Sequence, residues 1–201
     1  MPVSSSVNSL FVSEEARPFY INTSLERSEV VHDWLAEPFV IESGSCISLV
    51  PDPSCPLFRR LLTTQDLDVF KSWVGVPNAM IESGALKPPS TLPHVQPRRL
   101  EQAKDRLSTA ELADLKRAFD YFVFGRSGLV EDYRDAIVMH YSPFEVAVYA
   151  GRHVEIMPGA SVEVIDVAAV LEIDRLVIHS GGHLRLFTPA KVRINTLHKD
   201  A

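Results

Sequence analysis

Three stretches of the chain share one pattern of apolar and polar positions. Each consists of two short segments in which apolar and polar residues alternate, joined by a turn of small residues that contains glycine. Alternation with a period of two is typical of a strand with one buried face, and glycine next to serine or proline marks a turn. The three copies are 39–50 (FVIESGSCISLV), 154–165 (VEIMPGASVEVI) and 176–187 (LVIHSGGHLRLF).

The second and third copies lie 22 residues apart, and the likeness extends beyond them. Residues 171–176 match 192–197 after a slip of one residue, which makes Asp174 equivalent to Asn195, and both residue types are common in turns. Two short strands cannot bury their own apolar face, whereas stacked copies bury it between them. A repeat of about 21–22 residues therefore predicts stacked coils of short strands.

The predicted fold class is mainly β with a helical insertion, a short β-solenoid of the right-handed parallel β-helix type. The alternative is a meander of hairpins in an antiparallel β-sandwich or jelly roll, because Pro-Gly and Gly-Gly turns also reverse a strand. The equal spacing of side chains favours the coils. The coil model places Ile156 beside Ile178 and Val164 beside Leu186, and it predicts burial of six residues: Ile156, Val162, Val164, Ile178, Leu184 and Leu186.

Helical periodicity separates the first copy from the other two. Leucine and phenylalanine recur at helical spacing over 112–122, and Ser108 with Glu111 can form a capping box. If 39–50 is a true repeat, Ile41 and Ile47 join the same core as the later copies. The predicted organisation is a set of N-terminal strands that join the β core over 1–58, a helical insertion or cap over 59–131 with a proline-rich link at 87–97, and the coils over 132–201.

Charge and composition narrow the classes of partner. The net charge is −6, which argues against a nucleic-acid binder because phosphate binding requires clustered Lys and Arg. The chain has no apolar run of about 18 residues that would span a membrane, and its start lacks the pattern of a signal peptide. We therefore expect a cytoplasmic protein, with Cys46 and Cys55 as reduced thiols and a disulfide between them as the alternative.

The chain has no GxGxxG, GxxxxGK[ST], HExxH, CxxC or GxSxG motif. The candidate catalytic and metal-binding residues are instead side chains of the repeat region. His179 and His183 flank one turn, His153 precedes the equivalent turn, and Asp166 follows it. The candidate catalytic residues are His179, His183 and Asp166, and the candidate metal ligands are His179, His183 and His153. The alternative is that these histidines are ordinary surface residues, because they occupy outward positions of the coils.

The predicted function is a structural or protein-interaction module that binds a protein partner or a second copy of itself, without a cofactor. The ends of a stack are natural docking surfaces, and segments 1–58 and 175–201 have opposite charge, with eight acids against two bases and five bases against one acid. This favours a homo-oligomer and a non-enzymatic role. The alternatives are a carbohydrate-active enzyme, a polysaccharide lyase or hydrolase with a groove along the coils, and a histidine-based metal-binding protein.

Overall fold

The computed structural model describes residues 20–21, 37–165 and 167–200. The chain divides into two compact units, with 1–62 and 146–201 in unit 1 and 63–145 in unit 2. The sequence prediction for Asp166 therefore lies outside the described residues. Within the described part of the chain, no helix is both long and apolar enough to cross a membrane.

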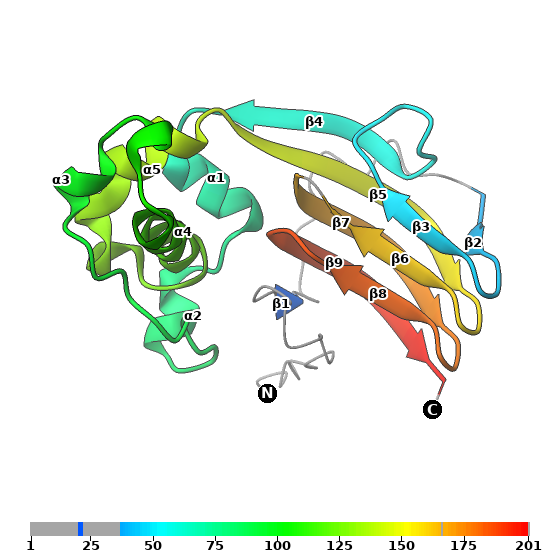
Figure 1. The fold of residues 1–201 in the computed structure, drawn as a ribbon. Helices are drawn as coiled ribbons and strands as arrows, with labels where there is room; N and C mark the ends of the chain where they lie inside the picture. The colour runs from blue at the N-terminus through cyan, green and yellow to red at the C-terminus, as the bar shows by residue number, and fades with distance from the viewer. Residues whose placement is uncertain (1–19, 22–36, 166, 201) are drawn as a thin grey trace. The chain divides into compact units, whose positions relative to one another are not determined.

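Unit 1 consists of two β-sheets (Figure 1). The larger sheet has the strand order β1-β9-β7-β5-β2, and β4 also pairs with β5. The smaller sheet has the order β3-β6-β8. The strands are β1 (Tyr20–Ile21), β2 (Phe39–Ile41), β3 (Cys46–Leu49), β4 (Phe58–Thr64), β5 (Phe144–Ile156), β6 (Ser161–Val164), β7 (Ala168–Ile178), β8 (His183–Leu186) and β9 (Ala190–Lys199).

The strands of these sheets pair so that equivalent residues of successive sequence repeats lie side by side. Ile156 pairs with Ile178 across β5 and β7, and Val164 pairs with Leu186 across β6 and β8, as the coil model predicted. Both pairs are parallel, and the two strands of each copy belong to different sheets. The hairpin interpretation is therefore wrong for these copies, because a hairpin would pair its own two strands antiparallel in one sheet.

The first copy joins the same sheets although more than a hundred residues separate it from the second. Phe39 on β2 pairs with Val154, and Ile47 on β3 pairs with Val162, again in parallel. Ile41 is fully buried and Ile47 is partly buried against the same core. The prediction that 39–50 is a true repeat is confirmed, and unit 2 is inserted in the chain between the first copy and the second.

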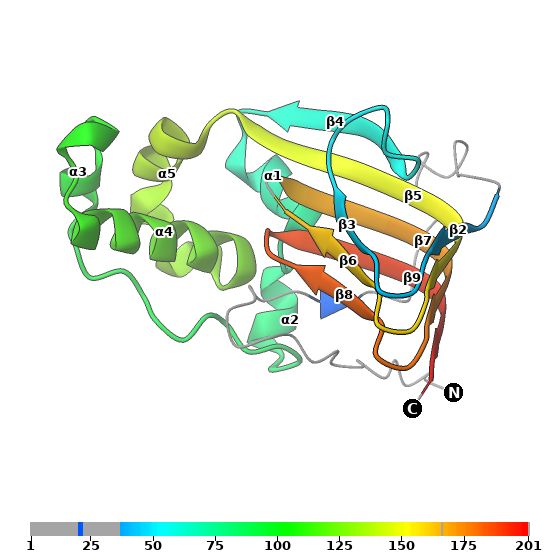
Figure 2. The same cartoon turned by 45° about the vertical axis from the view of Figure 1, so that its right-hand side comes forward.

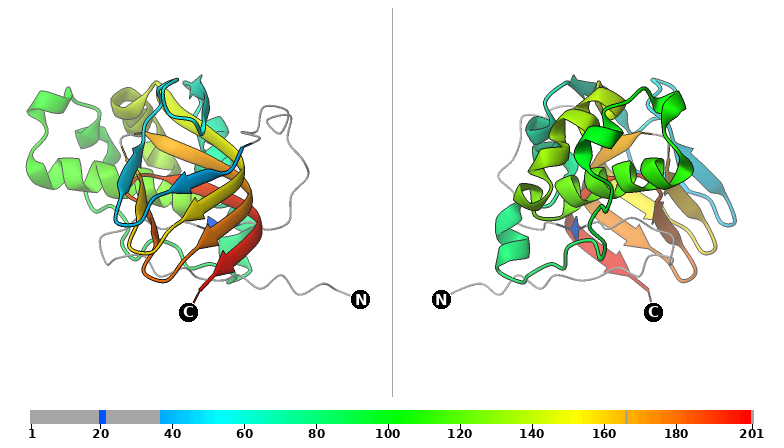
Figure 3. Two further views of the ribbon diagram at one scale, coloured as in Figure 1. Left: turned by 90° about the vertical axis from the view of Figure 1, so that its right-hand side faces the viewer. Right: turned by 60° about the vertical axis from the view of Figure 1, so that its left-hand side comes forward.

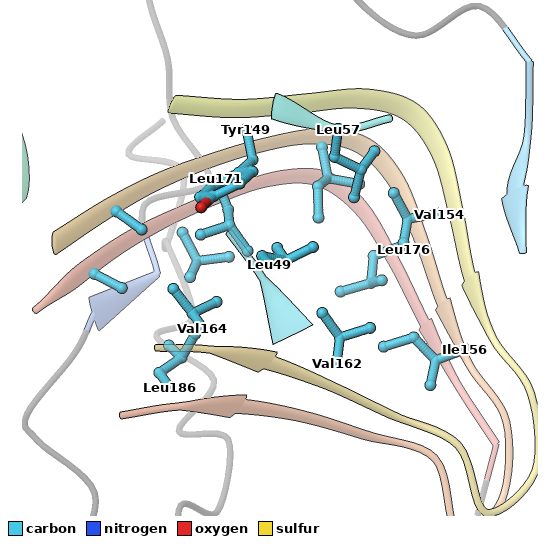
Figure 4. Close-up of a cluster of buried hydrophobic side chains, with 14 of the residues drawn as sticks. Leu49, Leu57, Tyr149, Val154, Ile156, Val162, Val164, Leu171, Leu176 and Leu186 are labelled. Atoms are coloured by element: carbon cyan, nitrogen blue, oxygen red, sulfur yellow. The ribbon is translucent and has the colours of Figure 1, made fainter. Parts of the chain in front are cut away.

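The core of unit 1 lies between the two sheets, where side chains of both layers meet (Figure 4). Five of the six residues predicted to be buried are 0 to 4% exposed. The exception is Leu184, which is only partly buried. Leu184 lies on β8, the edge strand of the smaller sheet, so the described residues provide it with a neighbouring strand on one side only.

The long strands bend at one position instead of ending there. On β7, Ile173 and Leu176 both belong to the core, so two successive residues between them face away from it. Asn195 Nδ2 donates to Asp174 Oδ1 over 2.9 Å at this bend. The predicted turn at Asp174 and Asn195 is therefore a corner within continuous strands, visible as the curvature of the larger sheet in Figure 2.

Unit 2 is helical, with α1 (Leu67–Val74), α2 (Asn78–Glu82), α3 (Pro97–Leu100), α4 (Thr109–Phe124) and α5 (Arg134–Tyr141). The capping box predicted at the start of α4 is present, with Ser108 and Glu111 as its two members. Phe119 of α4 packs its ring against Phe70 and Phe144 within the unit. Helix α5, drawn among the helices in the right view of Figure 3, occupies residues that the sequence interpretation placed in the coil region. Its buried residues are Ala136 and Ile137.

The proline-rich link at 87–97 is fixed to the helices by hydrogen bonds. The backbone N–H groups of His94 and Val95 donate to Asp114 Oδ2 over 3.0 and 2.7 Å. Tyr133 Oη donates to the Val95 carbonyl over 3.0 Å. Burial by itself raises the pKa of Asp114, but the two N–H donors and Arg117 outweigh burial, and the net pKa is lowered. The link is thus held at its C-terminal end by a charged acceptor on α4.

Candidate functional site

The turns that carry the candidate histidines have one conformation in all three copies. Gly44, Gly159 and Gly181 adopt φ values of 74°, 72° and 76°, in the left-handed region that favours glycine. The Gly181 turn follows β7, and His179 donates its backbone N–H to the Ile156 carbonyl over 2.9 Å. A tight turn of fixed geometry therefore holds His179 immediately after the last residue of β7.

The imidazole ring of His179 lies within hydrogen-bond distance of two carboxylates. Its Nε2 lies 2.7 Å from Glu155 Oε1, and its Nδ1 lies 2.7 Å from Asp200 Oδ2. An ionised carboxylate only accepts hydrogen bonds, so both bonds form together only when each ring nitrogen carries a proton, and they favour the imidazolium form of His179. The hydrogen bond to Glu155, followed by that to Asp200, raises the pKa of His179.

Two more histidines extend this contact in both directions. His153 Nε2 lies 4.0 Å from Glu155 Oε2, and His198 Nε2 lies 3.3 Å from Asp200 Oδ1. We call this set the histidine–carboxylate row: His153, Glu155, His179, Asp200 and His198. The row runs across β5, β7 and the end of β9, so it links three successive strands of the larger sheet by alternating histidine and carboxylate side chains.

Similar pairs of opposite charge join neighbouring copies elsewhere in unit 1. Arg185 Nη1 lies 3.2 Å from Glu163 Oε1, between β8 and β6. Arg193 Nη1 donates to Glu172 Oε1 over 2.7 Å, and both side chains are largely buried. The partners are 22 and 21 residues apart, which is the spacing of the repeat.

The structure brings together only part of the predicted site. His179 and His153 face the two oxygens of one carboxylate, that of Glu155. His183 instead begins β8 in the other sheet and is exposed. Among the described residues, no three His, Cys, Asp or Glu side chains are arranged to hold a metal ion. The predicted metal-ligand set of His179, His183 and His153 is thus not assembled.

The row is suited to cross-linking strands and poorly suited to acid–base catalysis. A histidine that acts as a general base must present a free ring nitrogen to its substrate. Both ring nitrogens of His179 are already hydrogen-bonded to carboxylates. The sequence interpretation missed Asp200 and His198 as members of the row. The signal was available, because the repeat spacing of 21 residues places Asp200 beside His179.

Unit 2 contains a polar cavity of about 660 Å³. Its charged side chains already bind each other in part, since Arg134 contacts both Asp68 and Glu131. The lining residues are Gln96, Pro97, Arg98, Glu101, Glu131, Asp132, Arg134 and Asp135. This mixture of both charges, without an aromatic or apolar floor, gives no indication of a particular ligand.

The two ends of the sheets are the remaining candidate surface. At one end, within the described residues, β8 pairs only with β6, and β9 pairs with β1 at Lys191 and Val192 alone. At the other end, β2 and β3 are the outer strands, and the exposed Glu42 directly follows β2. The β8–β9 end exposes mainly basic side chains: His183, Arg185, His198 and Lys199.

The two cysteines are free, with Cys46 exposed and Cys55 buried. No family model, curated protein or solved structure matches this chain. The functional argument therefore depends on the residues and geometry described above.

Proposed function

We propose that unit 1 is a short β-solenoid that serves as a protein-interaction module and binds partners at its open ends. Support for the solenoid comes from the parallel register, which repeats every 22 residues from β5 to β7 and from β6 to β8. A right-handed path follows from the strong preference of parallel crossovers for that hand.

The observation that carries the interaction role is the incomplete pairing of β8 and β9 within the described part of the chain. His183 N–H donates to the Ala160 carbonyl and Phe187 N–H donates to the Val164 carbonyl, both toward the interior of the stack. Alternate residues of a parallel strand bond to opposite neighbours, so Leu184 and Leu186 direct their backbone groups outward. Such an edge accepts an added strand, which is a common mode of protein recognition.

The opposite charges of the two terminal segments support binding at the ends of unit 1. The same two segments also contact each other within one chain. Tyr20 and Ile21, from the acidic segment 1–58, pair with Lys191 and Val192 from the basic segment 175–201. The two segments therefore meet in one molecule over these two residue pairs. Beyond them, from Arg193 to Lys199 and along β8, the described residues provide no further strand.

The alternative functions draw less support from the described residues. A polysaccharide lyase or hydrolase needs carboxylates or a base free to act, whereas Glu155, Glu163 and Glu172 are each paired with a cationic side chain. A metal-binding role needs a ligand cluster that the described residues do not form. The edge strands, by contrast, need no rearrangement to bind another strand.

Hydrogen exchange on the full chain tests the proposed function. We expect the Leu184 and Leu186 amides of dilute protein to exchange faster than the Val162 and Val164 amides of β6, because only the former lack an internal acceptor. Slow exchange of Leu184 and Leu186 in a monomer would show that the edge is already covered, and would overturn the proposed function. Cleavage of purified polysaccharides by the chain would favour the carbohydrate-active enzyme instead.

A further inference from the structure

Among the described residues, the outer edges at the two ends of unit 1 lack a strand partner at corresponding positions. At the β2–β3 end, the second half of β5 is covered by β2, while its first half lies beside Leu57 and β4, as the hydrogen bond from Ala150 N–H to the Leu57 carbonyl indicates. At the other end, β1 occupies the first part of β9. The β2–β3 end therefore presents two short strands, β2 and β3, and the other end presents the second half of β9 and the short strand β8.

From this match we infer that a second copy of the chain docks head to tail, with its β3 added in parallel to β8 and its β2 added to the end of β9. This inference rests on the proposed function, since it names the partner of the same edge. The contact is heterologous and does not close on itself, so it leads to chains of copies instead of a symmetric dimer.

The backbone groups of the two edges are complementary in this arrangement. Ser161 N–H of β6 donates to the Ser45 carbonyl, so Ser45 and alternate residues after it face the interior, and Cys46 and Ser48 face outward. On β8 the outward residues are Leu184 and Leu186, as derived above. Parallel stacking in the register of the existing copies then lets Ser48 N–H donate to the Leu184 carbonyl and Leu186 N–H donate to the Ser48 carbonyl.

Apolar side chains of the two copies also lie opposite each other in this register. Leu184 lies opposite Ile47, and Leu197 lies opposite Phe39. All four side chains are only partly buried in a single chain, so docking removes apolar surface from water at each of them. The contact therefore completes the core at both open ends.

Charge favours the head-to-tail arrangement over contacts between like ends. Glu37 and Glu42 are exposed beside β2, and no basic residue occurs from 37 to 50. Arg185 and Lys199 are exposed at the opposite end, and Lys199 falls one residue from Glu42 of the incoming copy. Two β8–β9 ends facing each other would instead bring together basic side chains.

Two variants that each block one end test the inference. Ser48→Pro removes an outward N–H from β3, and Leu184→Pro removes an outward N–H from β8, while neither loses a bond to β6. We expect wild type to form concentration-dependent oligomers in sedimentation velocity, and each variant alone to be a monomer. An equimolar mixture should form a 1:1 dimer, because one intact β8 edge meets one intact β3 edge.

Matched variants at Ser48 distinguish loss of the contact between copies from loss of the folded structure. Ser48→Ala keeps the N–H and should associate like wild type, whereas Ser48→Arg keeps the N–H but places a guanidinium opposite Arg185 and should weaken association. Circular dichroism confirms that each variant is folded. Self-association of Ser48→Pro would show contact between like ends and overturn the inference.

A wild-type chain that stays monomeric also overturns the inference, and hydrogen exchange then decides the fate of the proposed function. Fast exchange at Leu184 and Leu186 in that monomer would leave a free edge for a different protein, so the proposed function would stand without self-association. Slow exchange at Leu184 and Leu186 in that monomer would overturn the proposed function as well as the head-to-tail contact.

Discussion

Truncation of two core leucines distinguishes the middle of the stack from its end. Leu176 is 1% exposed and has a register partner on each side, Val154 on β5 and Leu197 on β9. Leu184 has one register partner in the part of the chain that the structure describes, Val162 on β6, and is partly buried. A Leu→Ala change at a fully buried site removes the transfer free energy of the side chain and leaves a cavity that its neighbours fill only in part.

The expected costs follow from these environments. We expect Leu176→Ala to lower the free energy of unfolding by about 3–4 kcal/mol, within the range for enclosed leucines. For Leu184→Ala we expect about 1–2 kcal/mol, because part of the side chain is already in water and solvent can enter the space left behind. The difference between the two variants arises because the described residues provide no neighbouring strand beyond β8.

Urea denaturation followed by far-ultraviolet circular dichroism measures both costs at a protein concentration low enough to keep the chain monomeric. The slopes of the two variants should equal that of wild type, so that midpoints report stability directly. Equal costs at the two positions, or a larger cost at Leu184, would refute the argument that β8 is an open edge. If copies associate as inferred above, the cost of Leu184→Ala should grow with protein concentration, while that of Leu176→Ala should not.

Three further predictions concern single side chains. Because the pKa of His179 is raised in the folded chain, the ring stabilises the fold fully below its pKa in the unfolded chain, about 6.5, and this stabilisation is lost as pH rises through the folded pKa. NMR titration of the ring should show the raised pKa. The variant His179→Gln should remove this pH dependence of stability. Asp114→Asn should destabilise unit 2 by about 1–3 kcal/mol near neutral pH, since the lowered pKa makes its contribution present above about pH 4 and lost in acid. Gly181→Ala should cost about 1–2 kcal/mol by thermal unfolding, because φ is 76° there, whereas Gly128→Ala, which meets no atom within 4 Å, should cost less.

Each of these predictions has a clear contrary result. A ring pKa of His179 at or below the usual value would mean that Glu155 and Asp200 do not hold the imidazolium. An Asp114→Asn chain as stable as wild type would mean that the N–H groups of His94 and Val95 are satisfied by water. Equal costs at Gly181 and Gly128 would remove the argument that the turn requires positive φ.

The spacing of the repeat predicted which strands neighbour each other and which side chains share a core. A fixed period places residue i beside residue i+22 or i+21, so Ile156 with Ile178 and Val164 with Leu186 could be paired before any coordinates existed. The same arithmetic predicts contact between His179 and Asp200, which the sequence interpretation overlooked. Within the repeat, local pattern and neighbour contacts carry the same information, because each copy packs against the next one along the chain.

The sequence by itself determined the β repeat, the turn glycines, the buried face of the repeat strands and the helical character of much of the predicted insertion, although residues 58–64 at its start form the strand β4. Only the tertiary structure decided that β1 and β2 lie at opposite edges of the larger sheet, that β8 ends the smaller sheet, and that Leu184 is therefore half-buried. The physical reason is that periodicity fixes the distance between consecutive copies, whereas the position of a strand that returns after a long insertion depends on which open edge it meets, and that information is not local.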